Sequence, residues 1–122
     1  MLHQILEKKK VFNMKKNSSD LCKLIKKSLN KNKAEEITII NLKKKTSIAD
    51  YMIICTGTSN RHIIALSNYL NEDLKDLNLN MMNVEGKKNG DWIVVDIGDV
   101  IIHLFRSEVR EYYNLEKMWS IK

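Results

Sequence analysis

The spacing of hydrophobic residues changes twice in the first third of the chain. From Leu21 onward they recur every three or four residues, which is the period of a helix with one buried side. This pattern predicts a helix over residues 19–31, and Ser18 or Ser19 is a residue type that begins one. Alternating isoleucines then follow, so a first strand is expected over residues 36–42.

A nearly continuous apolar stretch, DYMIICT at residues 50–56, is the next strand signal. Its β-branched residues and its lack of alternation are typical of a central strand buried on both faces. A Thr-Gly-Thr-Ser passage comes after it and leads into apolar residues of helical period. We therefore expect a long helix that is capped by Thr58 or Ser59 and extends to about Leu77. A short third strand is predicted around residues 81–84.

Two apolar segments, WIVVDI at residues 92–97 and VIIHLF at 100–105, flank the dipeptide Gly98-Asp99. Two strands around a two-residue loop that contains glycine predict a tight β-hairpin. The pairing gives one face that is entirely aliphatic, which we expect to be the core face. The pairs on the other face are Trp92 with Phe105, Val94 with His103, and Asp96 with Ile101.

The segment RSEVREYYNLEKMWS at residues 106–120 is typical of two short helices. We expect Ser107 to cap the first helix and Asn114 to cap the second. The resulting order α-β-β-α-β-β-β-α-α predicts an α/β (α+β) fold, a single small domain with a mixed sheet of about five strands and flanking helices. This domain is expected to span residues 18–122, after a basic extension at residues 1–17.

The formal charge of +6 favours a nucleic-acid partner, but the positive charge is unevenly distributed. Residues 1–33 hold ten lysines and two acidic residues, whereas residues 51–122 have a net charge of −2. We interpret the basic end as a solvated extension, with RNA contact as the alternative. The mildly acidic body is better suited to a basic protein surface.

No apolar run approaches the roughly 20 residues that cross a bilayer, so no membrane association is expected. The N-terminal charges are not followed by the apolar core of a secretory signal. Cys22 and Cys55 are far apart and form no CxxC motif, which argues against a disulfide framework and a zinc ribbon. These features fit a reducing compartment, and we expect the protein to be cytoplasmic.

Candidate catalytic and metal-binding residues are few and poorly arranged. Asp96 and Asp99 straddle the hairpin turn, whereas a two-metal site needs carboxylates aimed at one point, usually from alternate residues of one strand. Cys55 is expected to be an inert core thiol and His103 a hydrogen-bonded sheet residue. No metal, cofactor or small-molecule substrate is expected. The Gly-Thr-Ser passage that opens a helix leaves a nucleotidyltransferase-like enzyme as the alternative.

The second face of the hairpin is the informative feature, because it mixes aromatic, polar and aliphatic residues. One interpretation is that the C-terminal helices cover it. In that case Tyr112, Leu115, Met118 and Trp119 would pack on Trp92 and Phe105. The other is that Trp92 and its neighbours stay partly exposed as an anchor for another protein, since aromatic residues with a polar rim are typical of interface centres. A second copy of this chain is one such partner.

Four stretches occur in a characteristic order and spacing. They are ADYMIICTGTSNRHI (49–63), VEG (84–86), DWIVVDIGDVIIHLF (91–105) and REYYNLEKMW (110–119). Together they resemble the ribosomal silencing factor family, also called Iojap-like. The resemblance implies a nucleotidyltransferase-like topology without the catalytic acids, and therefore no enzymatic activity. It further implies binding to the large ribosomal subunit through ribosomal protein L-fourteen, which blocks joining of the small subunit and represses translation. Organelle relatives imply large-subunit assembly as an alternative role.

The hairpin face supplies the candidate contacts for such a partner. We expect Trp92 to be the apolar anchor. The polar candidates are Glu85, Asp96, Asp99 and His103, and the apolar candidates are Met82, Val94 and Phe105.

Other residues match the family motifs without an expected contact. These are Arg61, Arg110, Tyr113 and Glu116, which we interpret as bracing the fold. Arg110 and Glu116 are suited to an internal ion pair. Contact with ribosomal RNA is assigned, as an alternative, to the lysines of residues 1–17.

Overall fold

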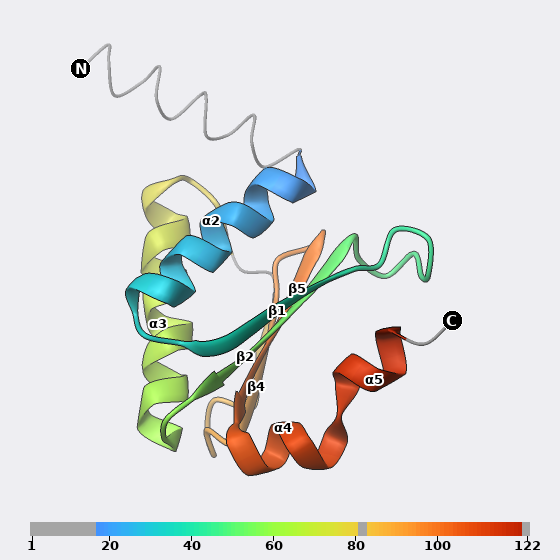
Figure 1. Cartoon of the computed structure of the whole chain (residues 1–122). Coiled ribbons are helices and arrows are strands. Elements are labelled where there is room, and N and C mark those ends of the chain that lie inside the picture. The colour runs from blue at the N-terminus through green and yellow to red at the C-terminus, as the bar shows by residue number, and fades with distance from the viewer. Residues whose placement is uncertain (1–16, 81–82, 121–122) are drawn as a thin grey trace, which may run out of the picture.

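A twisted sheet separates two layers of helices (Figure 1). The computed structural model describes residues 17–80 and 83–120. The elements in chain order are α2 (Ser18–Lys31), β1 (Glu35–Asn41), β2 (Tyr51–Gly57), α3 (Asn60–Asp76), β3 (Asn83–Glu85), β4 (Trp92–Asp96), β5 (Val100–Arg106), α4 (Ser107–Tyr113) and α5 (Leu115–Ser120). The predicted order of elements and the α/β class are confirmed. Residues 1–16 and the two methionines of the expected third strand, Met81 and Met82, lie outside the described residues.

The described strands form one five-stranded sheet in the order β1-β2-β5-β4-β3. β2 and β5 are parallel, and the other neighbouring pairs are antiparallel. β2 lies second from the edge, and its residues Ile53, Ile54 and Cys55 have no exposed surface. This confirms the prediction that the strand is buried on both faces.

The hairpin has the predicted register. Trp92 pairs with Phe105 and Val94 with His103. The turn is closed by the N–H of Ile97, which donates to the carbonyl of Val100 at 3.0 Å. Gly98 has a φ of +94°, a conformation that favours glycine, so the Gly-Asp dipeptide is well matched to this turn.

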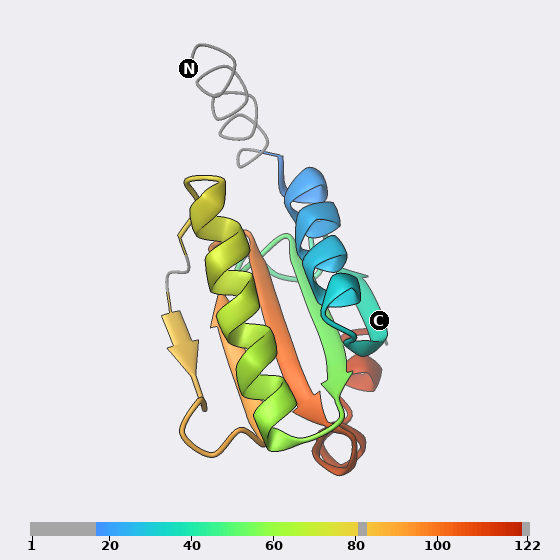
Figure 2. The same ribbon diagram turned by 90° about the vertical axis from the view of Figure 1, so that its left-hand side faces the viewer.

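Helices α2 and α3 lie side by side across the first face of the sheet (Figure 2). Their apolar stripes are buried against the aliphatic side of the hairpin, where Ile93, Val95 and Ile102 have no exposed surface. The Ser28 hydroxyl donates to Asp73 at 2.6 Å and joins the two helices. The carboxylate within the α3 stripe therefore has a partner from the neighbouring helix.

The second face carries a separate hydrophobic cluster. Its buried members are Ile40, Leu42, Ala49, Met52, Ile54 and Phe105. Leu115 and Trp119 pack on it from α5, and Val109 packs on it from α4. The expected cover by C-terminal helices is thus confirmed for these two α5 residues. For Tyr112 and Met118 it is wrong, because their side chains are 81% and 63% exposed.

Three of the expected helix caps differ in the structure. The N-cap of α2 is Asn17, whose side chain accepts from the backbone N–H of Ser19, so neither Ser18 nor Ser19 is the cap. Ser107 is the first residue of α4, and Arg106 precedes it without a side-chain cap bond. Asn114 ends α4 in the left-handed conformation and is its C-cap. The Ser59 cap of α3 is confirmed, since its side chain accepts from the N–H of His62.

Candidate partner-binding face

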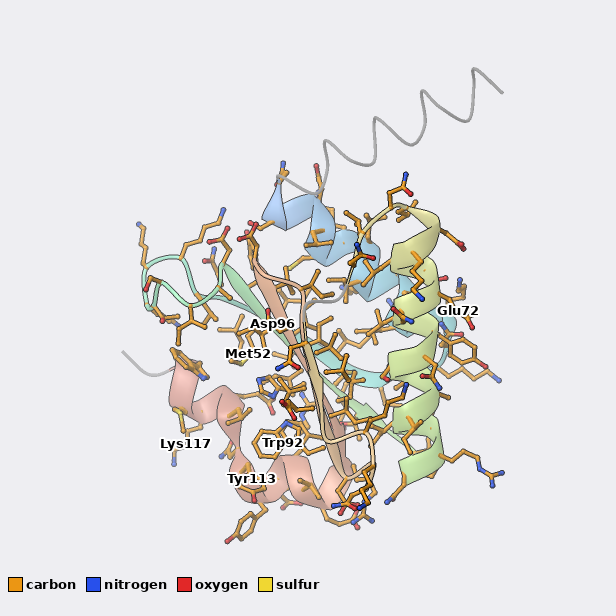
Figure 3. The ribbon with its side chains drawn as sticks, turned by 180° about the vertical axis from the view of Figure 1, so that it is seen from behind. Met52, Glu72, Trp92, Asp96, Tyr113 and Lys117 are labelled. Carbon is orange, nitrogen blue, oxygen red and sulfur yellow. The ribbon has the colours of Figure 1, made fainter. Side chains whose placement is uncertain are left out.

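The second face of the sheet is divided into two halves. Helices α4 and α5 pack over β1, β2 and β5, and we call this the covered half. The open half is formed by β3, β4 and the beginning of β5. Its side chains are Asn83, Glu85, Trp92, Val94, Asp96 and Ile101, each partly or fully exposed. Figure 3 views the sheet edge-on, with α3 on one side and α4 and α5 on the other, and shows Asp96 and Trp92 at different positions along β4.

Trp92 stands at the border between the two halves. Its indole N–H donates to Nδ1 of His103 at 2.9 Å, which fixes the orientation of the ring. The ring stacks on Phe105 at a centroid distance of 4.8 Å and meets Tyr113 of α4 at 4.7 Å. Trp92 is partly exposed and Tyr113 is 49% exposed. The structure therefore presents a rigid aromatic pair at the surface (Figure 3).

His103 lies beneath this pair and is only 8% exposed. Burial lowers the pKa of His103 from 6.5 to about 4, because the charged imidazolium is poorly solvated there. The neutral ring is also the form that can accept the indole N–H at Nδ1. The prediction that His103 is a hydrogen-bonded sheet residue is confirmed.

Two of the expected contacts are wrong. His103 was predicted to be a polar contact, but it is buried and its Nδ1 is already paired with Trp92. Phe105 was predicted to add apolar surface, but it has no exposed area because Trp92 and the α4–α5 helices cover it. Both residues support Trp92 from below, and neither can touch a partner directly.

The acidic candidates border the open half. Glu85 is exposed and pairs across the sheet with Val94, so both lie on the same face. Asp96 is partly exposed, and one of its carboxylate oxygens accepts the N–H of Gly98 at 2.8 Å. Asp99 is exposed in the turn. Met82 lies outside the described residues.

The α4–α5 cover is held in place by one buried arginine. Arg110 is 7% exposed and donates to both carboxylate oxygens of Glu116, at 2.9 and 3.0 Å. It also donates to the carbonyl of Glu36 and to the hydroxyls of Thr38 and Thr56. The hydrogen bonds from Arg110 hold the pKa of Glu116 below its ordinary value. The predicted internal ion pair is confirmed, and it ties the C-terminal helices to β1 and β2.

Some features of this side could not be read from the sequence. Tyr112 and Met118 are strongly exposed on α4 and α5, and the Tyr112 ring meets the Tyr113 ring at a centroid distance of 5.1 Å. The ring of His62, at the start of α3, accepts the N–H of Thr58 at 2.9 Å and lies 2.9 Å from the carbonyl of Asn32, so it joins α3 to the end of α2.

Within residues 17–80 and 83–120, no three His, Cys, Asp or Glu side chains are grouped so that they could hold a metal ion. Asp96 lies on the second face and Asp99 in the turn, as predicted. Cys55 is fully buried and burial raises the pKa of its thiol to about 12, as suits a core residue. None of the described helices is long and apolar enough to cross a membrane.

Comparison with known proteins gives consistent matches. Residues 15–122 match the family described as "Ribosomal silencing factor during starvation". A protein from Zymomonas mobilis named ribosomal silencing factor is 46% identical over 100 residues, which are 82% of this chain and 75% of that protein. One with the same name from Haemophilus influenzae is 42% identical over 88 residues, or 72% of this chain and 86% of that protein. A mouse protein named for mitochondrial assembly of the ribosomal large subunit is 37% identical over 97 residues, covering 77% of this chain and 42% of its own length.

Solved structures agree with the fold described above. A crystal structure of a Chromobacterium violaceum protein superposes with a TM-score of 0.81 at 35% identity, covering 85% of this chain and 87% of that one. A crystal structure from Bacillus halodurans gives a TM-score of 0.76 at 31% identity, covering 83% and 94% of the two chains.

Proposed function

The chain belongs to the ribosomal silencing factor family, and from this premise we propose that it binds the large ribosomal subunit through ribosomal protein L-fourteen. Once bound, it would occupy the surface on which the small subunit docks, and translation would be repressed. We place this activity in the cytoplasm and in the domain at residues 18–122, with residues 1–17 as an extension.

The exposed Trp92–Tyr113 pair is the observation that supports this proposal best. Trp92 is held by a hydrogen bond and by two ring contacts, so it loses little conformational freedom when a partner covers it. Aromatic side chains fixed in this way are the usual centres of binding energy in protein interfaces. Val94 supplies neighbouring apolar area on the open half.

Charge on the open half favours a basic partner. Glu85 and Asp99 are exposed and Asp96 is partly exposed, and none of the three forms an ion pair within the described residues. Unpaired acids at the rim of an interface speed encounter with a positively charged surface and fix its orientation. Many ribosomal proteins present such surfaces, since they also bind RNA.

The mechanism is competition for space and requires no chemical step. A specific interface buries about 800 Å² on each partner, roughly a tenth of the 7845 Å² surface of this chain. The rest of the domain then projects from the large subunit and obstructs the small one. The amount of inhibition should follow occupancy of this surface.

The proposal is tested by sedimentation with purified large subunits and by a subunit-joining assay. Glu85→Lys reverses one exposed charge on the open half, and Glu72→Lys makes the same change on α3, on the opposite side of the sheet. We expect Glu85→Lys to weaken binding and joining inhibition together, and Glu72→Lys to leave both unchanged. Equal binding by both variants, or failure of the wild-type chain to bind, would contradict the proposal.

Assembly of the large subunit is a second candidate, favoured by the name of the mouse relative. It would use the same surface on immature particles. Depleting the protein from cells and measuring large-subunit precursors separates the two roles. Precursors that accumulate during rapid growth support assembly, whereas a defect confined to subunit joining in starved cells supports silencing.

A further inference from the structure

The connection between β1 and β2 carries three consecutive lysines on an ordered framework. We call Lys43, Lys44 and Lys45 the lysine loop. Both ends of the connection are anchored, because Leu42 and Ala49 are buried in the second hydrophobic cluster. The carbonyl of Leu42 accepts the N–H of Lys45 at 2.9 Å, and the side chain of Asn41 accepts the N–H of Lys43 at 2.9 Å. The three lysines therefore project from a fixed turn.

The positive charge of this loop is not neutralised by any carboxylate within residues 17–80 and 83–120. All three side chains are exposed, and no carboxylate among the described residues pairs with them. The ammonium of Lys43 lies 5.4 Å above the Tyr51 ring, and that of Lys45 donates to the carbonyl of Trp119. Neither contact removes charge, so three adjacent cations are available to an anionic partner.

The lysine loop borders the partner-binding face. Lys45 contacts Trp119 of α5, and Trp119 and Trp92 pack against the same hydrophobic cluster. In Figure 1 the loop lies next to the last helix, α5. Glu85 lies on β3, at the opposite edge of the sheet from β1, whereas the turn that holds Asp99 lies beside the connection, because the Asp99 carbonyl accepts the N–H groups of Asp50 and Tyr51. A particle that covers Trp92 and Tyr113 would thus meet Glu85 toward one edge of the sheet and the lysines toward the other.

We propose that the lysine loop binds phosphates of ribosomal RNA while the open half binds protein. The inference rests on the proposed function, since it needs the large subunit as the partner. A ribosomal subunit presents both a basic protein surface and RNA phosphate at its surface, and the two flanks match these two chemistries. This assigns RNA contact to an ordered part of the domain, independently of residues 1–17.

Salt dependence of binding provides the first test. Affinity for large subunits is measured at several salt concentrations for the wild-type chain, for Lys43→Gln/Lys44→Gln, and for Lys26→Gln/Lys27→Gln. The control pair is exposed on α2, on the opposite side of the sheet. Removing phosphate contacts should reduce the slope of log affinity against log salt by roughly 1 for each lysine. We expect that reduction for the loop variant and an unchanged slope for the control.

Crosslinking identifies the contacted molecule. Cys22 and Cys55 are buried and burial raises the pKa of each thiol to about 12, so they react slowly. A photocrosslinker can therefore be attached selectively after Lys44→Cys, with Lys26→Cys as the control. Crosslinks to RNA from position 44 only support the inference. Crosslinks to protein alone, or an unchanged salt slope, would overturn it while wild-type binding still upholds the proposed function. If the wild-type chain does not bind large subunits, both the inference and the proposed function are contradicted.

Discussion

The covered and open halves of the second sheet face share a strand, β5, yet they have opposite roles. In the covered half, Phe105 and Ile54 have no exposed surface and Arg110 binds the helices to the sheet. In the open half, Val94 and Asp96 stay partly exposed because α4 and α5 pack mainly over β1, β2 and β5 on this face. The contacts that hold the fold together are concentrated in the covered half, and the proposed binding surface lies in the open half. Substitutions in the two halves should therefore separate the two properties.

The largest effect on stability is expected from Phe105→Ala. This change removes a fully buried ring from the second cluster and takes away the surface on which Trp92 stacks. Loss of a buried aromatic side chain costs about 3–5 kcal/mol. Chemical denaturation followed by tryptophan fluorescence measures this cost. A loss below about 1 kcal/mol would show that the covered half does not hold the fold together.

The second largest effect on stability is expected from lowering the pH, and it acts through His103 at the boundary of the two halves. Its folded-state pKa is lowered to about 4, so its stabilising contribution is complete above pH 6.5 and is lost as pH falls toward 4. Between pH 6.5 and pH 4 the imidazole is protonated in the unfolded state but not in the folded state. The free energy of unfolding therefore falls by on the order of 3 kcal/mol across this range.

Comparison with His103→Gln isolates this effect. The free energy of unfolding is measured from pH 7 to 4.5, above the range in which Glu116, with its lowered pKa, is protonated. We expect the wild-type chain to lose more stability than the variant as pH falls. Parallel curves would contradict the burial assigned to His103.

A smaller loss is expected from Arg110→Lys in the covered half. Lysine keeps the charge but cannot reproduce the two parallel bonds to Glu116 together with those to Thr38 and Thr56. We expect a loss of about 2 kcal/mol, measured by denaturation. Binding to large subunits should decline as well, because α4 positions Tyr113 beside Trp92. If the variant has the stability and the affinity of the wild-type chain, the hydrogen bonds of Arg110 are not needed to hold α4 and α5 in place.

The smallest effect on stability is expected from Asp96→Asn in the open half. Asparagine keeps an oxygen that can accept the Gly98 N–H, so the free energy of unfolding should change by less than about 0.5 kcal/mol. Affinity for large subunits should nevertheless fall, because one rim charge is removed. A variant that binds as tightly as the wild-type chain would exclude Asp96 from the interface.

The parts of the fold that could be predicted from the sequence are those decided by local contacts. The hairpin register follows from a two-residue turn, so all pairs from Trp92–Phe105 to Asp96–Ile101 could be predicted. The strand order across the sheet could not, because the pairing of β2 with β5 joins segments almost 50 residues apart. Local patterns carry no information on which distant strands become neighbours.

The sequence predicted which face of the sheet carries the candidate site, but not which residues of that face are exposed. Alternation along β5 assigns His103 and Phe105 to the same side as Trp92, but it does not say what packs above them. The burial of Phe105 depends on α4 and α5, which Arg110 ties to the sheet through Thr38 and Thr56, and that of His103 depends on the position of the Trp92 ring. Hydrogen bonds between residues far apart in the sequence cannot be predicted from the spacing of those residues. For the same reason the exposure of Tyr112 could not be foreseen.

The parallel pairing of β2 with β5 also bears on how this protein is made. β2 is an apolar strand of residues 51–57, and its neighbour β5 ends at residue 106. During synthesis β2 therefore leaves the exit tunnel long before its partner strand, with one edge unpaired and prone to aggregation. The domain can close only when the chain has been translated through β5. Premature termination anywhere before β5 should yield insoluble fragments in place of smaller folded units.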